Sequence, residues 1–136
     1  MTLGQALLEP TRIYIKQVLP AAQAGLIKGM SHITGGGFIE NIPRVLPKGT
    51  GCLVDASAWE LPPVFKFLMK HGGVEPFEMA RTFNNGIGMV VIVSKESVDA
   101  TVGALNPAGN AEVCQIKEIT QKEGVVMNNM HVWSWA

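Results

Sequence analysis

The sequence has no excess of charge of either sign and no long apolar run. Its 136 residues carry eleven basic and eleven acidic side chains, so we expect no basic surface of the kind that binds nucleic acid. No apolar run approaches the roughly 18–20 residues that cross a bilayer, so no membrane partner is expected. The first ten residues lack a basic stretch ahead of an apolar one, which argues against a secretory signal and favours a cytoplasmic protein.

Clustered cysteines are also absent. Cys52 and Cys114 stand apart, with neither a CxxC motif nor a Cys/His spacing around them. Metal and redox centres need ligands at set spacings, so neither cysteine is a candidate for one. Both are expected to remain free thiols in a reducing compartment.

The chain is rich in apolar residues and poor in charge. Apolar residues make up 47% and charged residues 16%, where ~25% charged is typical of soluble domains. Either part of the surface is covered by another domain or subunit, or the core is large for a chain of this length. Composition leaves both explanations open.

Residue patterning predicts a single domain in which helices and strands are intermixed. The last two strands are separated only by a turn at residues 121–123, which favours an α+β fold over a purely parallel sheet. We expect a mixed, mostly antiparallel sheet covered by helices on one side. Predicted helices occupy residues 11–24, 38–46, 62–71, 75–81 and 95–105, and predicted strands residues 28–33, 51–56, 88–94, 112–119 and 124–128.

Single residues set the expected ends of these elements. Thr11 is an N-cap candidate for the first helix, which Pro20 should end or kink. Ser94 is an N-cap candidate for the last helix. The run at 88–94 is continuous and β-branched, which is typical of a strand buried on both faces.

Three consecutive glycines follow the first predicted strand. Gly35, Gly36 and Gly37 allow a tight bend and leave their amide N–H groups unobstructed. A helix beginning just beyond them would add its positive end, so a phosphate or another anion could bind there. The alternative is a flexible turn, because the run matches neither GxxxxGK[ST] nor GxGxxG.

Polar side chains flank these glycines. Thr34 offers a hydroxyl group, and Asn41 and Arg44 are polar residues about one helical turn apart. His32 is the nearby side chain of the residue type that most often transfers protons in enzymes. Its alternative task is that of a hydrogen-bonded histidine at the end of a strand.

A second polar segment with glycines precedes the strongest predicted strand. Arg81 and Thr82 are followed by Asn84, Gly86 and Gly88. Spaced glycines before a buried strand suggest a loop whose backbone approaches a ligand, and Arg81 could hold a phosphate or carboxylate with two hydrogen bonds. The alternative is a type I′ turn that leads into the strand. Two such loops in one small domain shift the balance modestly towards a ligand site. We expect the two bends to converge, so that their bare amides and Arg81 line a common oxyanion pocket.

Other polar residues are expected to have structural tasks. Asp55 and Ser57 should cap a turn or helix, and His71 lies at a predicted helix end, where a cation meets the helix dipole. The tail, residues 131–136, carries two tryptophans. Either they dock, or the tail meets another chain, or it frays.

The segments that carry these glycines resemble a known family. HITGGGFIENIPRVL, residues 32–46, is similar to the signature of phosphoribosylformylglycinamidine cyclo-ligases, also called aminoimidazole ribonucleotide synthetases. LGQALLEPTRIY, residues 3–14, resembles the segment that joins the two halves of those enzymes. WELPPVFKF, residues 59–67, and RTFNNGIGM, residues 81–89, resemble the start of the intervening helix and the second glycine loop. The resemblance spans residues 3–106 in order and spacing.

The resemblance implies an α+β carboxy-terminal domain that packs on an amino-terminal domain within a homodimer. The amino-terminal domain would bind most of the ATP and magnesium, and nothing in this chain resembles it. We therefore expect residues 1–136 to form one domain that is inactive alone. Residues 1–14 would be the interdomain connector and helix start, and residues 129–136 an uncertain tail.

The implied reaction is an ATP-dependent ring closure in de novo purine biosynthesis. The formyl oxygen of formylglycinamidine ribonucleotide is phosphorylated, an amidine nitrogen attacks the activated carbon, and phosphate leaves as aminoimidazole ribonucleotide forms. The phosphorylated ribonucleotide substrate would therefore be the ligand of this domain.

The resemblance also implies roles for the residues of both segments. His32 would handle a proton or orient the amide oxygen, Asn41 would hold the polar edge of the substrate, and Arg81 with Asn84 would contact substrate or phosphate. Further contacts to substrate or phosphate are expected from Thr34, Gly35, Gly36, Gly37, Arg44, Thr82, Gly86 and Gly88.

The sequence departs from the family pattern in places. Asn85 stands where many relatives have cysteine, so a cysteine there cannot be essential if this chain belongs to an active enzyme. Gln115 stands where a small residue such as glycine is expected. Alternatives are a related enzyme, such as thiamine-monophosphate kinase, selenophosphate synthetase or a hydrogenase-maturation protein, or a non-catalytic module that binds a ligand or partner. The NIPR string after the glycines favours the cyclo-ligase.

Overall fold

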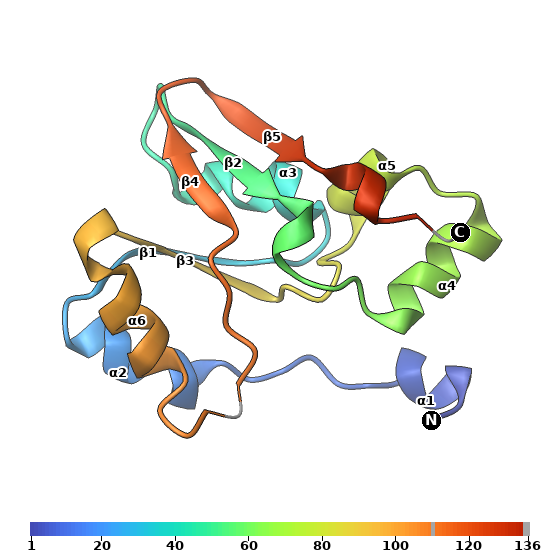
Figure 1. Cartoon of the computed structure of the whole chain (residues 1–136), viewed down its shortest axis with the longest axis horizontal. Coiled ribbons are helices and arrows are strands. Elements are labelled where there is room, and N and C mark those ends of the chain that lie inside the picture. Colours follow the sequence, from blue (N-terminus) through green and yellow to red (C-terminus); the bar gives the residue numbers. More distant parts are fainter. Residues whose placement is uncertain (110, 135–136) are drawn as a thin grey trace.

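The computed structural model describes residues 1–109 and 111–134 and has an α+β fold (Figure 1). Its α-helices are α1 (Leu3–Leu7), α2 (Ile15–Gln23), α3 (Gly37–Asn41), α4 (Pro63–Gly72), α5 (Pro76–Thr82) and α6 (Val98–Leu105). None of these described helices has the length and apolarity to cross a membrane. The strands are β1 (Ile27–His32), β2 (Gly51–Asp55), β3 (Met89–Val93), β4 (Lys117–Thr120) and β5 (Gly124–Asn128).

The strands divide between two small sheets. β1 and β3 pair antiparallel, from Ile27 opposite Val93 to His32 opposite Met89. In the other sheet β2 is central, with β4 antiparallel on one edge and β5 parallel on the other. β4 and β5 follow each other in sequence, yet β2 lies between them. The α+β class and the mixed, mostly antiparallel strand pairing are therefore confirmed.

One face of the β1–β3 sheet is covered by α2 and α6. Ala21 of α2 and Leu105 of α6 are buried together, and Met89 and Val91 of β3 pack against them. Side chains alternate between the two faces of a strand. Val90, which lies between Met89 and Val91, therefore faces the other way, into the main core.

The main core joins the β4–β2–β5 sheet to α3, α4 and α5. Its centre includes Val54 of β2, Phe38 of α3, Met69 of α4 and Met79 of α5, all fully buried. Burying a side chain of this size stabilises the fold by about 1.5–3 kcal/mol relative to leaving it in water. This core therefore fixes α3, which follows β1, and α5, which precedes β3.

The first long helix begins later than predicted and continues through its proline. α2 starts at Ile15, and its N-cap residue Tyr14 makes no side-chain cap, so Thr11 is not the cap. Pro20 was expected to end or kink the helix, but α2 runs three residues beyond it. Burial of Ala21 against α6 outweighs the single backbone hydrogen bond that a proline removes.

Several other elements are shorter than predicted. The helix predicted at 38–46 divides into α3 and a 3₁₀ turn. Ser94 caps no helix: its hydroxyl donates to that of Ser97 at 2.9 Å, and a 3₁₀ turn precedes α6. The strand predicted at 112–119 shrinks to β4, because pairing with β2 begins only at Lys117.

β3 is less buried than its composition suggests. Val90 is buried, whereas the rest of the strand is half-buried. One face packs on α2 and α6, but residues of β3 also line a cavity between the two sheets. The strand is therefore not buried on both faces, as had been predicted.

A short helix that the sequence did not predict begins the chain. The amide of Gln5 donates to the hydroxyl of Thr2 at 3.2 Å, and the amide of Thr2 donates to Gln5 Oε1 at 2.8 Å. This reciprocal pair is a capping box, which fixes the start of α1. From α1 the chain runs extended along one edge of the molecule to α2 (Figure 1).

The tail docks on the main core. Trp133 is 2% exposed, and its Nε1 donates to the carbonyl oxygen of Ala56 at 3.1 Å. Docking, one of the three expected alternatives, is therefore confirmed for Trp133. The second tryptophan, Trp135, lies outside the described residues.

Candidate functional site

Two glycine-bearing loops lie side by side at one end of the β1–β3 sheet. The GGG loop (residues 33–37) follows β1 and the NNG loop (residues 83–88) precedes β3, so antiparallel pairing brings both to the same end. The amide of Ile33 donates to the carbonyl oxygen of Gly88 at 2.9 Å. The convergence of the two loops, expected from the sequence, is confirmed.

Two glycines of the GGG loop are required by its packing. Gly37 is buried with φ +54°, and a Cβ atom there would collide with the carbonyl oxygen of Ala80 and lie 2.9 Å from that of Phe83. Gly36 has φ +98°, and its Cβ would lie 2.6 Å from the carboxylate of Glu40. Both positions need glycine, because the backbone is left-handed and a neighbour fills the space.

Gly35, the first glycine of the loop, is not required by packing. A Cβ atom at Gly35 would meet nothing within 4 Å, and Gly35 is exposed together with Thr34. This part of the loop is therefore open to a ligand. The helix beyond it, α3, has only five residues. A helix this short adds little dipole, so the contribution of a helix N-terminus that was expected from the sequence is not supported.

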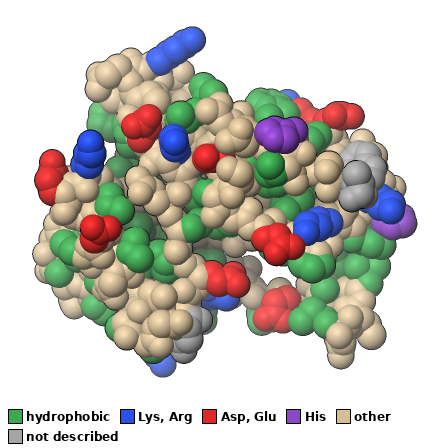
Figure 2. Space-filling view, in the orientation of Figure 1, with side chains coloured by type: hydrophobic (Ala, Val, Ile, Leu, Met, Phe, Trp, Pro, Cys, Tyr) green, Lys and Arg blue, Asp and Glu red, His purple; other side chains and the backbone are tan. Residues whose placement is uncertain are grey.

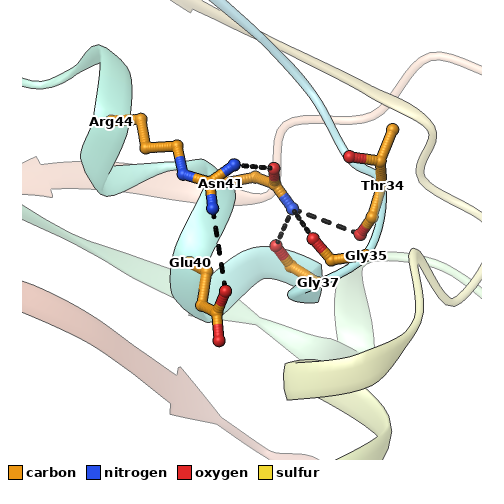
Figure 3. Close-up of polar contacts among 6 residues, drawn as sticks. All are labelled: Thr34, Gly35, Gly37, Glu40, Asn41 and Arg44. Atoms are coloured by element: carbon orange, nitrogen blue, oxygen red, sulfur yellow. Dashed lines mark hydrogen bonds and ion pairs between the residues drawn. The ribbon is translucent and has the colours of Figure 1, made fainter.

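Asn41 holds the GGG loop from inside (Figure 3). Its Nδ2 donates to the carbonyl oxygens of Thr34 at 3.2 Å, Gly35 at 3.2 Å and Gly37 at 2.8 Å. Its Oδ1 accepts a hydrogen bond from Arg44 Nη1 at 3.2 Å. The side chain is buried and its carboxamide is used within the loop. Asn41 therefore shapes the loop, a task different from the substrate contact that was expected.

Arg44 lies on the outer side of this network. Its Nη2 is 3.7 Å from Glu40 Oε2, and the arginine side chain is 64% exposed. An ion pair this exposed contributes only ~0–1 kcal/mol to stability. Arg44 therefore places a positive charge near the GGG loop but contributes little to the stability of the fold.

His32 is exposed and lies beside Tyr14. The two rings make an edge contact, with centroids 6.0 Å apart and planes at 69°. The Tyr14 hydroxyl fills the space that a side chain at Gly88 would take. Tyr14 therefore contacts both the end of β1 and the NNG loop. Sequence reasoning did not identify it as a site residue, and its place at the end of the family-like segment 3–14 was the one available indication.

The NNG loop contains a tight turn. Asn85 and Gly86 have φ of +52° and +96°, and the amide of Ile87 donates to the carbonyl oxygen of Asn84 at 2.9 Å. These features match the type I′ turn that the sequence suggested. The amide of Gly86 also donates to Asn84 Oδ1 at 3.0 Å. The turn is confirmed, and a ligand contact by the loop stays a prediction.

Asn85 fixes this turn to α5. It is 0% exposed, and its Nδ2 donates to the carbonyl oxygens of Met79 at 2.8 Å and Phe83 at 3.0 Å. Its Oδ1 has no hydrogen-bond partner within the part of the chain that the structure describes. The position at which the sequence departs from the family pattern is therefore buried and structural here.

Arg81 and Thr82 lie on the exposed side of α5. Arg81 Nη1 is 3.5 Å from Glu78 Oε1, and the arginine side chain is 55% exposed. A cavity of about 540 Å³ between the two sheets is lined by Gly86 and Gly88, but neither by the GGG loop nor by Arg81. This cavity therefore does not unite both loops with Arg81, as the common pocket expected from the sequence would.

Asp55 and Ser57 have the structural task that the sequence predicted. Ser57 donates from its hydroxyl at 2.6 Å and its amide at 2.9 Å to Asp55 Oδ1, and Asn129 Nδ2 donates to the same atom at 2.9 Å. These hydrogen bonds, the Ser57 hydroxyl first, lower the pKa of Asp55 to about 2. Asp55 therefore stays ionised, and it fastens the tail to the end of β2.

Neither cysteine has the lowered pKa of a reactive thiol. Both are free, and burial raises the pKa of Cys52 to about 11, which disfavours the reactive thiolate. Within residues 1–109 and 111–134, no three His, Cys, Asp or Glu side chains gather so as to hold a metal ion. Basic and acidic side chains are interspersed over the face in Figure 2, in keeping with the balanced composition.

The chain is similar to a described family of domains. Residues 1–128 match the family model described as "AIR synthase related protein, C-terminal domain". Curated relatives named phosphoribosylformylglycinamidine cyclo-ligase are similar to it over most of its length. The relative from Neisseria meningitidis serogroup C is 51% identical over 123 residues, which are 90% of this chain and 36% of that protein.

Two further curated relatives carry the same name. The protein of that name from Alkaliphilus oremlandii is 51% identical over 108 residues, 79% of this chain and 32% of the relative. The relative from Arabidopsis thaliana, whose name adds "chloroplastic", is 48% identical over 124 residues, 91% of this chain and 32% of the relative. The chain thus spans about a third of the length of the curated relatives that it matches.

Proposed function

Because this chain belongs to the family of AIR synthase related proteins as their C-terminal domain, we propose that it is the carboxy-terminal part of a phosphoribosylformylglycinamidine cyclo-ligase. Three relatives of that name, 48–51% identical, support the proposal. The observation that carries it is the paired arrangement of the GGG and NNG loops, with His32 and Tyr14 beside them. The whole protein would close the imidazole ring of aminoimidazole ribonucleotide in purine biosynthesis.

The chemistry asks the protein for charge stabilisation and positioning. The formyl oxygen of formylglycinamidine ribonucleotide receives a phosphoryl group from ATP. An amidine nitrogen then attacks the formyl carbon, and phosphate leaves from that carbon. Backbone amides and cations that surround the anionic oxygens stabilise the charge that develops. The amides of Gly35 and Gly36, with Thr34 and Arg44 beside them, are our candidates for that task; the amide of Gly37 instead donates to the carbonyl oxygen of Thr34.

His32 is our candidate for moving a proton in this reaction. An exposed imidazole can give or accept a proton near neutral pH. His32 is the last residue of β1 and contacts Tyr14, whose hydroxyl group lies against Gly88 of the NNG loop. We assign Arg81, Thr82 and Asn84 to contacts with the substrate or its phosphate, on the exposed side of α5 and the NNG loop. Asn41 is a positioning residue for the GGG loop.

ATP and magnesium are assigned to an amino-terminal domain of the same protein. The described residues of this chain do not form a magnesium site, so we derive no step through the ion here. The N-terminal segment offers a surface for such a domain: Leu8 is 83% exposed and Ile13 79% exposed. Apolar side chains this exposed favour contact with another domain. We propose that residues 1–14 connect the two domains.

A fusion protein tests the proposal. The amino-terminal domain of the Neisseria meningitidis relative is joined ahead of Met1, and phosphate release is measured with ATP and formylglycinamidine ribonucleotide. We expect turnover by the fusion and none by the isolated chain. Turnover by the isolated chain would contradict the need for a second domain. A folded but inactive fusion, beside an active intact relative, would contradict the cyclo-ligase assignment.

A substrate panel separates the alternatives. Thiamine monophosphate and selenide are offered to the same fusion with ATP, since related enzymes of those kinds also activate an oxygen or selenium atom. Consumption of ATP with either, and not with formylglycinamidine ribonucleotide, would favour the related enzyme. A homodimeric assembly and a cytoplasmic location stay predictions, which sedimentation of the fusion and cell fractionation would test.

A further inference from the structure

Trp59 lies between the two glycine-bearing loops. Its Nε1 donates to the carbonyl oxygen of Asn85 at 2.8 Å, so it holds the backbone of the NNG loop. Its ring makes an edge contact with Phe38, with centroids 5.7 Å apart and planes at 62°. Phe38 directly follows the GGG loop and is 0% exposed. One side chain therefore contacts the supports of both loops.

Trp133 packs against Trp59 in turn. Their ring centroids are 5.5 Å apart with planes at 68°, again an edge contact. The Trp133 ring is buried, and its indole N–H is satisfied by Ala56. Phe38, Trp59 and Trp133 thus form a chain of aromatic pairs from the GGG loop to the tail. Edge-to-face pairs fix the relative orientation of rings more strictly than aliphatic packing does.

The tail is fastened where it makes this contact. Asn129 donates to Asp55 at the end of β2, and the amide of Trp133 donates to the carbonyl oxygen of Met130 at 3.0 Å, which closes a short 3₁₀ turn. Trp133 lies beyond residue 128, where the match to the family ends. The family resemblance therefore assigns no role to this residue.

From these contacts we propose that Trp133 is a positioning residue, which keeps the NNG loop in its type I′ turn by holding the ring of Trp59. Asn85 and Gly86 both have positive φ. Asparagine adopts this conformation more readily than most non-glycine residues, and its surroundings here help to enforce it. The hydrogen bond from Trp59 supplies part of that enforcement. Its relevance to ligand binding rests on the proposed function, whereas its effect on the loop does not.

Hydrogen exchange tests the effect on the loop directly. The amide of Ile87 closes the turn by its bond to Asn84, and the amide of Asn106 bonds to Val102 at the end of α6, in the other apolar cluster. In Trp133→Phe, which loses the indole N–H donor to Ala56 and weakens the contact with Trp59, exchange at Ile87 should accelerate by about fivefold to tenfold, while exchange at Asn106 is unchanged. Uniform acceleration at both amides, or none at Ile87, would overturn the proposal.

A double substitution tests whether Trp133 acts through Trp59. Trp59→Phe removes the indole donor to Asn85 but keeps an aromatic ring. If Trp133 acts through that donor, Trp133→Phe should add nothing to the exchange rate of Ile87 in a Trp59→Phe background. Additive acceleration would overturn the proposal. Val132→Ala, next to Trp133 but 46% exposed, is the matched control and should leave the exchange rate unchanged.

A titration with inorganic phosphate tests the role of Trp133 and the proposed anion site separately. Phosphate is titrated into the unchanged chain and into Trp133→Phe, and the amide resonances of Gly35 and Gly86 are followed. If Trp133 positions the loop for an anion, the dissociation constant should rise by at least about threefold in Trp133→Phe, in line with the exchange result. Absence of binding to the unchanged chain would count against the proposed anion site, and the exchange rates alone would then decide the role of Trp133.

Discussion

The hydroxyl group of Tyr14 occupies the space that a side chain at position 88 would need. Tyr14 precedes α2, and Gly88 ends the NNG loop just before β3. The same tyrosine ring touches His32 at the end of β1. Three segments that are distant in sequence therefore meet at one aromatic residue beside the candidate site.

This contact predicts the effect of a small substitution. Gly88→Ala places a methyl group against the Tyr14 hydroxyl, so we expect the free energy of unfolding to fall by ~1–3 kcal/mol, measured by urea denaturation. Adding Tyr14→Phe should recover part of the loss, because it removes the colliding oxygen. Gly35→Ala is the control: its Cβ meets nothing within 4 Å, so a change beyond ~0.5 kcal/mol would contradict the packing described.

The network around Asn41 predicts a larger loss. Asn41→Ala removes the donor to three backbone carbonyl oxygens of the GGG loop. Loss of these three hydrogen bonds, of which the one to Gly37 is buried, should lower the free energy of unfolding by ~2–3 kcal/mol. Arg44→Ala, which removes an exposed ion pair, should cost less than ~1 kcal/mol in the same denaturation experiment. Equal losses in the two variants would show that Asn41 does not hold the loop.

The two neighbouring asparagines of the NNG loop should respond differently to a negative charge. Asn85→Asp replaces a buried donor with a carboxylate that faces the carbonyl oxygens of Met79 and Phe83. We expect a loss of ~3–5 kcal/mol, or failure to fold. Asn84→Asp keeps an acceptor for the amide of Gly86 and should be nearly neutral. Thermal melting of both variants at neutral pH checks this, and a neutral Asn85→Asp would contradict the burial described.

The lowered pKa of Asp55 predicts that the stability of the fold decreases at acidic pH. Its hydrogen bonds lower the pKa to about 2 in the folded chain, below its ordinary value of 3.8. A carboxylate with a lowered pKa contributes stability that is fully present above the unfolded value and is lost as the pH falls through the folded value. Between pH ~4 and ~2 the melting temperature should therefore fall less steeply in Asp55→Asn than in the unchanged chain. Asn129→Ala, which removes one donor, should lie between them; identical slopes would contradict the role of Asp55.

His32 predicts a loss of catalysis without a loss of stability. In the fusion with an amino-terminal domain, His32→Ala should lower kcat by ~10²–10⁴-fold if the imidazole moves a proton. The melting temperature should hardly change, because the side chain is exposed. His71→Ala, also exposed but at the end of α4, should keep full activity. Full kcat in His32→Ala would remove the proton-handling role.

Local sequence patterns were sufficient for several features. Pro63 begins α4 and the left-handed Gly73 ends it, close to the predicted bounds. The type I′ turn at Asn85 and Gly86 and the cap at Asp55 were also predicted. Each of these depends on the conformational preference or hydrogen bonding of residues close together in the chain. Such features can be predicted from local sequence, although a distant contact, such as the hydrogen bond from Trp59 to Asn85, can also support them.

Features that depend on distant partners were missed or only partly predicted. The order of β4, β2 and β5, the contact of Tyr14 with Gly88, and the docking of Trp133 each join residues far apart in sequence. The continuation of α2 through Pro20 has the same origin, because burial against α6 overrides a local preference. The proximity of Asn41 and Arg44 was predicted from their helical spacing, but the hydrogen-bond partners of Asn41 could not be inferred from residue type.

The central place of β2 has a consequence for synthesis of the chain. Both neighbours of β2 come from residues 117–128, more than sixty positions later in the sequence. As the polypeptide leaves the ribosome, β2 emerges with both edges unpaired, and it stays so until β4 and β5 follow. Pairing between such remote segments is slow, and bare strand edges invite association with other chains. Nascent chains halted near residue 110 should therefore be the ones that depend most on chaperones.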